Sequence, residues 1–424
     1  MMTLSIPKPG FKRNRLKTNL AVYLLMAPFF FGFLTGFLGM PGVVRYTMDI
    51  AWCLPVVLAL KKGSLRLHRS LLPMACLAAI FLLYTLVCII FRLQSPVWYL
   101  WGLRNNFRFY AAFFIFAAFL RQDDTEQLFR VLDVLFWIHI GVSLFQFAAL
   151  GIRQDFLGGI FGVERGRNAG YTIPFFLVML SRWLLAMMNG TASLSGCMAR
   201  CAAALLVAAL AEMFGFFLMF GLIFLLAALL TRFSWRKCLL FLLLAAAVSV
   251  CSSLLLEMFG EGSHLTPQII LRRMFAENYA TSTDLGRLTA IPTLCRTLVT
   301  DGAQRLFGLG LGNCDTSTFA LCNSDFYRQY SYLHYTWFLS AFLFLETGFV
   351  GLGIYLLFFV ACLIRAAGLL RRRRGNLLYC QMGMILSVLC LVLTFYNSAL
   401  RAEGGYVMYF ALALPFIGAE RKEA

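Results

Sequence analysis

The sequence predicts an all-α membrane protein, a polytopic integral helical bundle of about 12 transmembrane helices with one large extracytoplasmic loop. Hydrophobic residues make up 61% of the 424 residues and charged residues only 13%, whereas about a quarter of an average soluble protein is charged. Apolar segments of about 20 residues, enough to cross a bilayer as a helix, recur along the chain. No segment alternates polar and apolar residues as the strands of a membrane β-barrel do.

The predicted spans divide the chain into three parts. Nine helices fill residues 1–258, a large loop with short helices fills 259–332, and three helices fill 333–424. Residues 39–42 offer no small-residue cleavage site, so we expect the first span to be an uncleaved helix. The spans lie near residues 20–39, 43–60, 71–91, 105–120, 129–150, 169–189, 198–212, 214–231, 238–258, 337–364, 377–394 and 405–419.

The distribution of basic residues predicts the orientation, because Lys and Arg concentrate in cytoplasmic loops. The loops that share a side with both termini, together with the adjacent helix ends, carry 23 of the 37 Lys and Arg residues. We therefore expect a multi-pass protein of the bacterial inner membrane with both termini in the cytoplasm. This topology accounts for most of the net charge of +18, so the charge requires no nucleic-acid partner.

The basic residues of the predicted outer face are all arginine, and there are 14 of them. A guanidinium group can grip phosphate oxygens through two parallel hydrogen bonds, which an ammonium group cannot do. We therefore hypothesise an outer site for a phosphorylated ligand. The alternative is that the chain is rich in arginine throughout and that some of these side chains reach lipid headgroups.

Two outer loops carry the arginines of greatest interest. In the long loop, Thr266 and Pro267 predict the start of one short helix. Asp284 is the expected N-cap of another, which would place Arg287 in a first turn where the helix dipole disfavours a cation. In the loop 151–174, Arg165 and Arg167 precede a helix whose N-terminal amides attract anions.

The glycine-rich segment RLFGLGLGNCD in the long loop does not have the context of a nucleotide-binding loop. No strand precedes Gly308, Gly310 and Gly312, and no Lys-Ser or Lys-Thr pair follows them. A G-x-G-x-G pattern alone is weak evidence for phosphate binding. We therefore expect a tight turn here.

Three segments together resemble the membrane family of O-antigen ligases and of O-antigen, capsular and exopolysaccharide polymerases. They are FGVERGRNAGYTIP, GRLTAIPTLCRTLVTDGAQRLFGLGLGN and HYTWFLSAFLFLETGFVG, and they cover roughly residues 150–365. The chain departs from the family pattern at three places. Tyr335 replaces the Asn that usually follows the histidine, residues 288–291 lack a tryptophan, and Glu212 stands where a Ser-Arg-Gly element is common.

The resemblance implies a GT-C-like enzyme that transfers a glycan from a polyprenyl diphosphate to a sugar hydroxyl at the outer face, without cofactor or metal. By position in the motifs, Arg287 would hold the diphosphate, with Arg165 or Arg167 as its partner across a cavity. His334 would lie near the acceptor hydroxyl as base or orienting group, since histidine titrates near working pH. The implied partners are the bilayer, a lipid-linked glycan, a flippase and a chain-length regulator.

Six further positions are candidates for a supporting role. Acidic side chains at outer helix ends can orient arginines or bind acceptor hydroxyls. We expect Glu346 to be structural, either paired with an arginine such as Arg401 or at a shallower depth because its segment starts as an interfacial helix. The six positions are Glu164, Glu212, Glu346, Tyr335, Asn168 and Asn313.

Three functions stay open at this point. A polymerase is favoured slightly over an O-antigen ligase, because the departures from the motifs suggest distance from the ligases. A transporter of lipid-linked oligosaccharide is the third, but the chain shows neither related halves nor charged residues grouped at helix centres. Cys314 and Cys322 could form a disulfide, and no cysteine or histidine spacing indicates a metal site.

Overall fold

The computed structural model describes residues 15–61, 69–92, 95–232, 235–259, 274–276, 278, 281, 283–317 and 319–417. Within these ranges the secondary structure is helical, and no described residue lies in a strand. The all-α prediction is therefore confirmed for this part of the chain.

Twelve α-helices of the described residues occupy the twelve predicted ranges. They are α1 (Arg15–Phe37), α2 (Thr47–Lys61), α3 (Leu72–Arg92), α4 (Pro96–Phe119), α5 (Gln122–Ala148), α6 (Ile173–Met188), α7 (Leu194–Leu210), α8 (Phe214–Leu230), α9 (Trp235–Phe259), α14 (Leu339–Arg371), α15 (Leu377–Tyr396) and α16 (Gly405–Ala413). Among the described residues, six segments are long and apolar enough to cross a membrane, and they correspond to α1, α3, α5, α6, α14 and α15. The helices α7, α8 and α16 are apolar but shorter, so the number of crossings stays a prediction.

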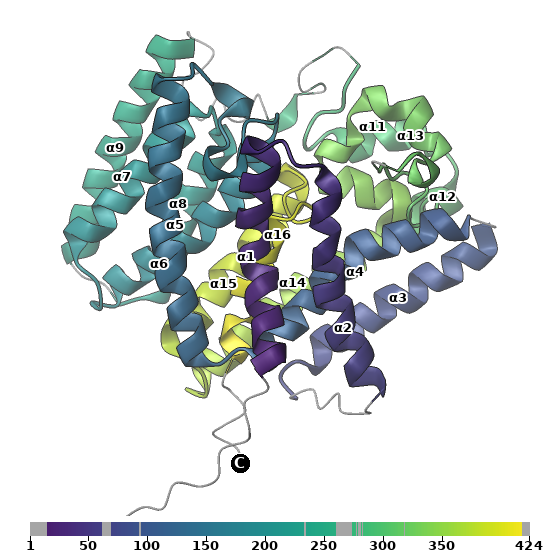
Figure 1. Ribbon diagram of the computed structural model, residues 1–424, viewed down its shortest axis with the longest axis horizontal. Coiled ribbons are helices and arrows are strands. Elements are labelled where there is room, and N and C mark those ends of the chain that lie inside the picture. Colours follow the sequence, from purple (N-terminus) through teal and green to yellow (C-terminus); the bar gives the residue numbers. More distant parts are fainter. Residues whose placement is uncertain are drawn as a thin grey trace, which may run out of the picture.

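Short helices fill the connections. They are η1 (Gly42–Tyr46), η2 (Gln154–Phe156), η3 (Gly159–Phe161), the π-helical η4 (Asn168–Thr172), α11 (Ala290–Thr297), α12 (Gly302–Phe307), η6 (Ala320–Cys322), α13 (Asp325–Tyr330), η7 (Ser331–Leu333), η8 (Tyr335–Trp337) and η9 (Leu414–Phe416). The green group α11, α12 and α13 lies together at the upper right of Figure 1. The described part of the loop 259–332 is therefore folded, whereas Thr266 and Pro267 lie outside the described residues.

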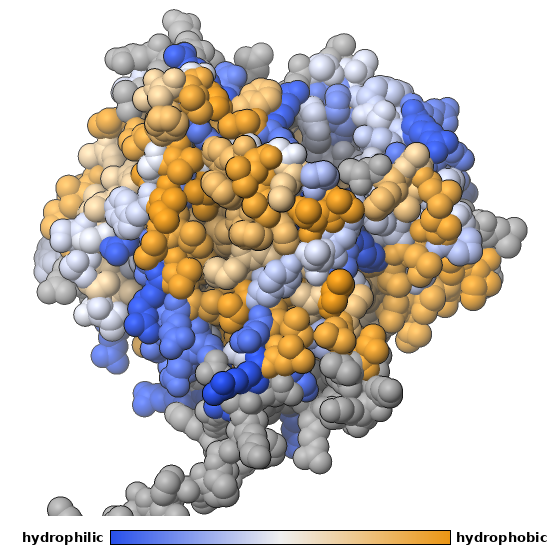
Figure 2. Space-filling model, viewed as in Figure 1, coloured by the Kyte–Doolittle hydropathy of each residue, from blue (hydrophilic) through white to orange (hydrophobic). Residues whose placement is uncertain are grey.

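The helix α6 belongs to the most buried of the six candidate spans. In the span Asn168–Met188, 89% of the most apolar window is buried, compared with 22% for Leu72–Ile90 at the edge. Figure 1 shows α1 and α16 in the middle, α7, α8 and α9 on the left, and α2 and α3 on the right. Hydrophobic side chains cover much of the face seen in Figure 2, with hydrophilic ones gathered at its lower end and upper right, as expected of a protein that spans a lipid layer.

Connections predicted to share a side do meet in the structure. At one end, the Thr18 hydroxyl donates to the carbonyl of Phe119 at 3.4 Å and the Asn189 amide donates to Gln381 at 2.7 Å. At the other, the Asn397 amide donates to the Ala169 carbonyl at 3.1 Å. The grouping of the loops is thus as predicted, while the assignment of one end to the cytoplasm stays a prediction.

The helix α14 is broken at Gly348, and the glycine-rich loop fills the break. Gly348 has φ 62°, and a Cβ there would lie 2.3 Å from the Leu306 carbonyl oxygen. The amides of Leu309 and Gly310 donate to the carbonyls of Leu345 and Glu346 at 2.8 and 2.9 Å. Gly308 and Gly312 also have positive φ, so these glycines serve close backbone packing.

The helix expected after Asp284 begins later than the sequence predicts. The Asp284 carboxylate accepts the backbone N–H of Thr281 at 2.9 Å, so it stabilises the preceding turn instead of a helix start. The Leu285 amide donates to the Leu333 carbonyl at 3.1 Å, and α11 starts only at Ala290. Arg287 therefore lies in the turn before α11, and the prediction that it occupies a first turn was wrong.

Candidate functional site

A cavity of about 950 Å³ opens at the end of the bundle where the predicted outer loops meet. Its walls come from the α1–α2 connection, the segment before α6, the α7–α8 turn, the turn before α11, and the connections before α14 and after α15. Charged residues on the lining are Arg45, Asp155, Glu164, Arg165, Arg167, Glu212 and Arg287. Three of the arginines selected from the sequence, Arg165, Arg167 and Arg287, therefore share one site.

Arg287 is held by Tyr396 at the end of α15. Its guanidinium carbon lies 4.1 Å from the centroid of the Tyr396 ring, and it donates to the Tyr396 carbonyl at 3.5 Å. The Gly215 amide donates to the Tyr396 hydroxyl at 2.9 Å. One tyrosine thus fixes Arg287 and connects it to the start of α8.

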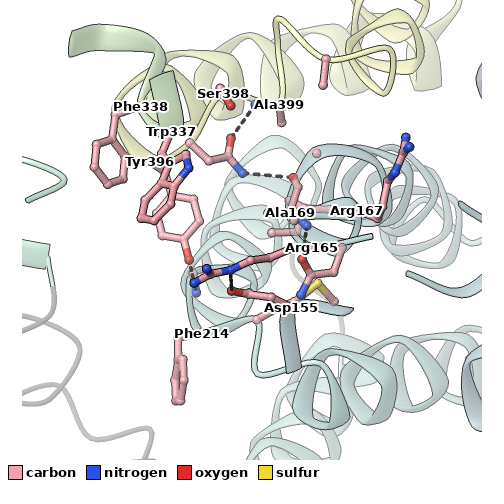
Figure 3. Close-up of a pocket in the computed structure, with 18 of the residues that line it drawn as sticks. Asp155, Arg165, Arg167, Ala169, Phe214, Trp337, Phe338, Tyr396, Ser398 and Ala399 are labelled. Atoms are coloured by element: carbon pink, nitrogen blue, oxygen red, sulfur yellow. Dashed lines mark hydrogen bonds and ion pairs between the residues drawn. The ribbon is translucent and has the colours of Figure 1, made fainter. Parts of the chain in front are cut away.

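Arg165 is the exposed arginine of the segment before α6. Its side chain is 60% exposed, and it forms a 3.7 Å ion pair with Asp155 that is drawn as a dashed line in Figure 3. Its guanidinium lies 5.6 Å from the centroid of Trp337. Because neither contact buries it, Arg165 is available to a ligand in the cavity.

Arg167 lies in the wall instead. Its side chain is only 5% exposed, forms an ion pair with Glu164, and packs over the ring of Tyr171 with 5.1 Å between guanidinium and centroid. The structure therefore separates two arginines that the sequence left equivalent. Arg165 faces the cavity, and Arg167 supports its wall.

His334 lies beside the cavity and is not among the residues that line it. It has a left-handed backbone with φ 51° between the short helices η7 and η8, so it precedes α14 instead of starting it. Its ring stacks on Trp337 with 4.0 Å between centroids. Trp337 does line the cavity, so His334 contacts the site indirectly, by packing on the Trp337 ring.

The α7–α8 turn places Glu212 on the lining. Asn168 donates to the Ala211 carbonyl at 3.1 Å, and its side-chain oxygen accepts the Ala169 amide at 2.6 Å. Of the supporting positions, Asn168, Glu164 and Glu212 thus belong to the cavity.

Asn313, Tyr335 and Glu346 do not line the cavity, and Tyr335 and Glu346 are buried. The Tyr335 hydroxyl donates to the Cys314 carbonyl at 2.7 Å, and burial raises its pKa, so it stays a neutral donor. Asn313 donates to the Leu309 carbonyl at 2.6 Å. The Glu346 carboxylate accepts the Gly312 amide.

Arg401 is not the partner of Glu346, contrary to the pairing suggested from the sequence. It forms an ion pair with Asp315, because the glycine-rich loop carries Asp315 to the connection after α15. Cys314 and Cys322 are both free thiols.

A charged network lies behind the cavity wall. Glu403 accepts a hydrogen bond from the Tyr171 hydroxyl, and its other oxygen lies 3.5 Å from a nitrogen of Arg108. Burial alone would raise the pKa of the Glu403 carboxyl, but attraction to Arg108 and Arg45 and the Tyr171 hydrogen bond together lower it to about 2. The network therefore holds Tyr171, a lining residue, in a fixed position.

Sequence reasoning missed four residues of the cavity. Arg45 appeared only as one of many outer arginines, and Trp337 only as one of several aromatics. Tyr396 and Asn397 end a long apolar span just before a short loop. A polar Tyr-Asn-Ser break between two apolar segments is the signal that could have marked them.

No protein-family model matches the chain and no curated protein matches its sequence significantly.

The cavity combines a cationic part with an apolar part. Four arginines face three carboxylates on its lining, while Met213, Phe214, Leu218 and Met274 supply apolar surface. Leu218 is 44% exposed on α8, so the apolar wall continues onto the outer surface of the bundle. Such a site suits a ligand with an anionic head and an apolar tail. No cluster of three or more histidine, cysteine or acidic residues that could hold a metal ion occurs among the described residues.

Proposed function

We propose that the protein is a polysaccharide polymerase that transfers a glycan from a polyprenyl diphosphate to a sugar hydroxyl. The observation that carries this proposal is the gathering of Arg45, Arg165 and Arg287 from three distant segments in one cavity with an apolar wall. The arginines would bind the diphosphate, and the apolar wall beside Leu218 would take the first part of the lipid.

The chemistry requires little more from the protein than this arrangement. A diphosphate is already a good leaving group, so the protein must stabilise the charge that develops on it and position the acceptor. Planar guanidinium groups can do so through paired hydrogen bonds to phosphate oxygens. Trp337 and Tyr396 offer aromatic faces on which sugar rings can pack.

His334 has a positioning role in this proposal. Its ring stacks on Trp337, and Trp337 in turn packs against Arg165. We therefore expect His334 to act by orienting Trp337, and the acceptor's proton to be taken by a group on the lining.

The packing between the two ends of the bundle supports an enzyme over a transporter. A second cavity of about 570 Å³, lined by Arg182 and Asn189, lies at the other end of α6. Between the two cavities, residues 175–181 of α6 are all 0% exposed. A reaction at one face needs no polar path through the bundle, whereas transport does.

The proposal places the protein in the bacterial inner membrane, with the cavity at the outer face and both termini in the cytoplasm. A reporter fused after residues 371–374 is expected to report the cytoplasm, and one within 259–332 the outside. The opposite pattern would put the arginine cavity on the wrong side for a flipped donor.

The direct test is a reaction of the purified protein with lipid-linked oligosaccharide from a deletion strain, in which this donor should accumulate. A ladder of repeat multiples, absent with Arg287→Ala, is the expected result. Products that form only after a second, different acceptor is added would make the protein a ligase. No transfer with either acceptor would refute glycosyl transfer.

A further inference from the structure

Glu212 has a backbone conformation that its side chain disfavours. It has φ 53°, and only four non-glycine residues of the described chain have positive φ. Left-handed backbone disfavours glutamate, which lacks the short side chain that lets Asn or Asp adopt it. Such residues persist where the surrounding structure holds them, and they cluster at functional sites.

Two anchors hold the turn that carries Glu212. On one side, the carbonyl of its neighbour Ala211 accepts the Asn168 amide at 3.1 Å, next to Arg167. On the other, the Gly215 amide donates to the hydroxyl of Tyr396, the residue that packs against Arg287. The turn is thus fixed to both segments that bring arginines to the cavity.

Two further carboxylates of the lining, Asp155 and Glu164, come from the segment before α6. Asp155 pairs with Arg165 and Glu164 pairs with Arg167. These two acids orient the arginines that precede α6. Glu212 comes from a separate wall, between the anchors of Arg167 and Arg287, where an acceptor would approach a diphosphate bound to the arginines.

We propose that Glu212 is the general base of the glycosyl transfer, an inference that rests on the proposed function. Its carboxylate takes the proton of the acceptor hydroxyl as that oxygen bonds to the anomeric carbon. The bond from the anomeric carbon to the diphosphate oxygen breaks, and the lipid diphosphate leaves with the electron pair. The proton on Glu212 then passes to solvent or to the released diphosphate.

The first test compares Glu212→Gln with the wild type on the same lipid-linked donor. A positioned base contributes about 10²- to 10⁴-fold to the rate. We expect kcat to fall at least about 100-fold, the donor KM to stay within about threefold, and the acidic limb of the pH profile to disappear. Titratable and charged groups that share the cavity with Glu212, or lie beside it, are Arg45, Asp155, Glu164, Arg165, Arg167, Tyr171, Arg287, Tyr396 and His334.

The Glu212→Gly variant tests whether a loss of activity comes from the missing carboxylate or from misfolding. Glycine adopts positive φ without strain, so the α7–α8 turn should keep its conformation, and a cooperative thermal unfolding transition would show that the variant is folded. Formate added to this variant should restore part of the activity, because a free carboxylate can then take the proton. His334→Phe keeps an aromatic ring on Trp337 but no titratable nitrogen, so its pH profile should keep the acidic limb that Glu212→Gln loses.

The outcomes separate the inference from the proposed function. If the wild type transfers no glycan, the proposed function fails and the assignment of Glu212 fails with it. If the wild type is active, the base assignment is overturned by a Glu212→Gln variant within tenfold of the wild type, by an unchanged acidic limb, or by no formate rescue. Loss of activity in His334→Phe with an active Glu212→Gln would move the base to His334.

Discussion

The Gly312 amide donates to Oε1 of Glu346 at 2.9 Å, which joins the glycine-rich loop to the middle of the broken helix α14. Glu346 is 0% exposed, so this hydrogen bond is shielded from water. A carboxylate in an apolar span therefore has a structural function here, since it accepts a buried backbone donor of the loop that fills the break in the helix.

Replacement of Glu346 should lower the free energy of unfolding, and the decrease should be larger when the acceptor of the Gly312 hydrogen bond is removed. Glu346→Ala leaves the Gly312 amide without its partner and creates a cavity, so we expect a loss of about 1–3 kcal/mol. Glu346→Gln keeps an oxygen of similar position and should lose less. Thermal unfolding of both variants in detergent measures the difference, and equal melting temperatures would refute the role of this hydrogen bond.

Gly348→Ala should destabilise the protein because φ 62° and the carbonyl of Leu306 leave no space for a side chain. We expect at least about 1 kcal/mol from the backbone conformation alone. Gly353 in the same helix is the matched control, since a Cβ there would meet nothing within 4 Å. Gly353→Ala should leave the melting temperature unchanged or raise it, and a similar decrease in both variants would contradict the explanation.

Helix positions were predictable from the sequence because long apolar runs leave few alternatives in a membrane. Every predicted span contains a helix, and the break at Gly348 was missed because hydropathy does not report backbone φ. The start of α11 was also missed. Whether the Asp284 carboxylate stabilises a helix or the preceding turn depends on Leu285 pairing with the distant Leu333.

The sequence predicted the chemistry of the candidate site, a group of arginines for an anionic ligand, but only some of the residues that form it. The preference for arginine over lysine marked Arg165, Arg167 and Arg287, which the fold brings to one cavity. Charge alone could not tell the exposed Arg165 from the buried Arg167, because burial depends on the packing of Tyr171 and Glu164. Tyr396 escaped notice since its role arises only from the position of α15 against α8.

Glu403 should contribute stability that depends on pH. Its pKa is lowered from 4.5 to about 2, so the contribution is complete above about pH 4.5 and is lost as pH falls toward 2. The upper limit is about 3 kcal/mol at neutral pH. Glu403→Gln should be less stable at pH 7 and show a weaker decrease in melting temperature between pH 5 and 3. Parallel pH curves for the two proteins would show that this carboxyl is not responsible.

Arg287→Lys should impair turnover although it preserves the charge. Lysine cannot pack a planar group on Tyr396 or offer two parallel donors to a diphosphate. We expect Arg287→Ala to lose about 10²- to 10³-fold in kcat/KM, with Arg287→Lys between this value and the wild type. Full activity of the lysine variant in the lipid-linked donor assay would remove Arg287 from diphosphate binding.

Substitution of Arg165 should weaken donor binding, whereas substitution of Arg167 should lower stability. Arg165 is 60% exposed at its side chain, so Arg165→Ala should leave the melting temperature within a degree or two while it raises the donor KM about tenfold. Arg167 is 5% exposed and packs between Glu164 and Tyr171, so Arg167→Ala should lower stability by about 1–3 kcal/mol. Both variants are measured by thermal unfolding and by donor titration at fixed acceptor. A stable Arg167→Ala protein with a raised KM would reverse the two roles, because it would show that the ligand reaches the buried arginine.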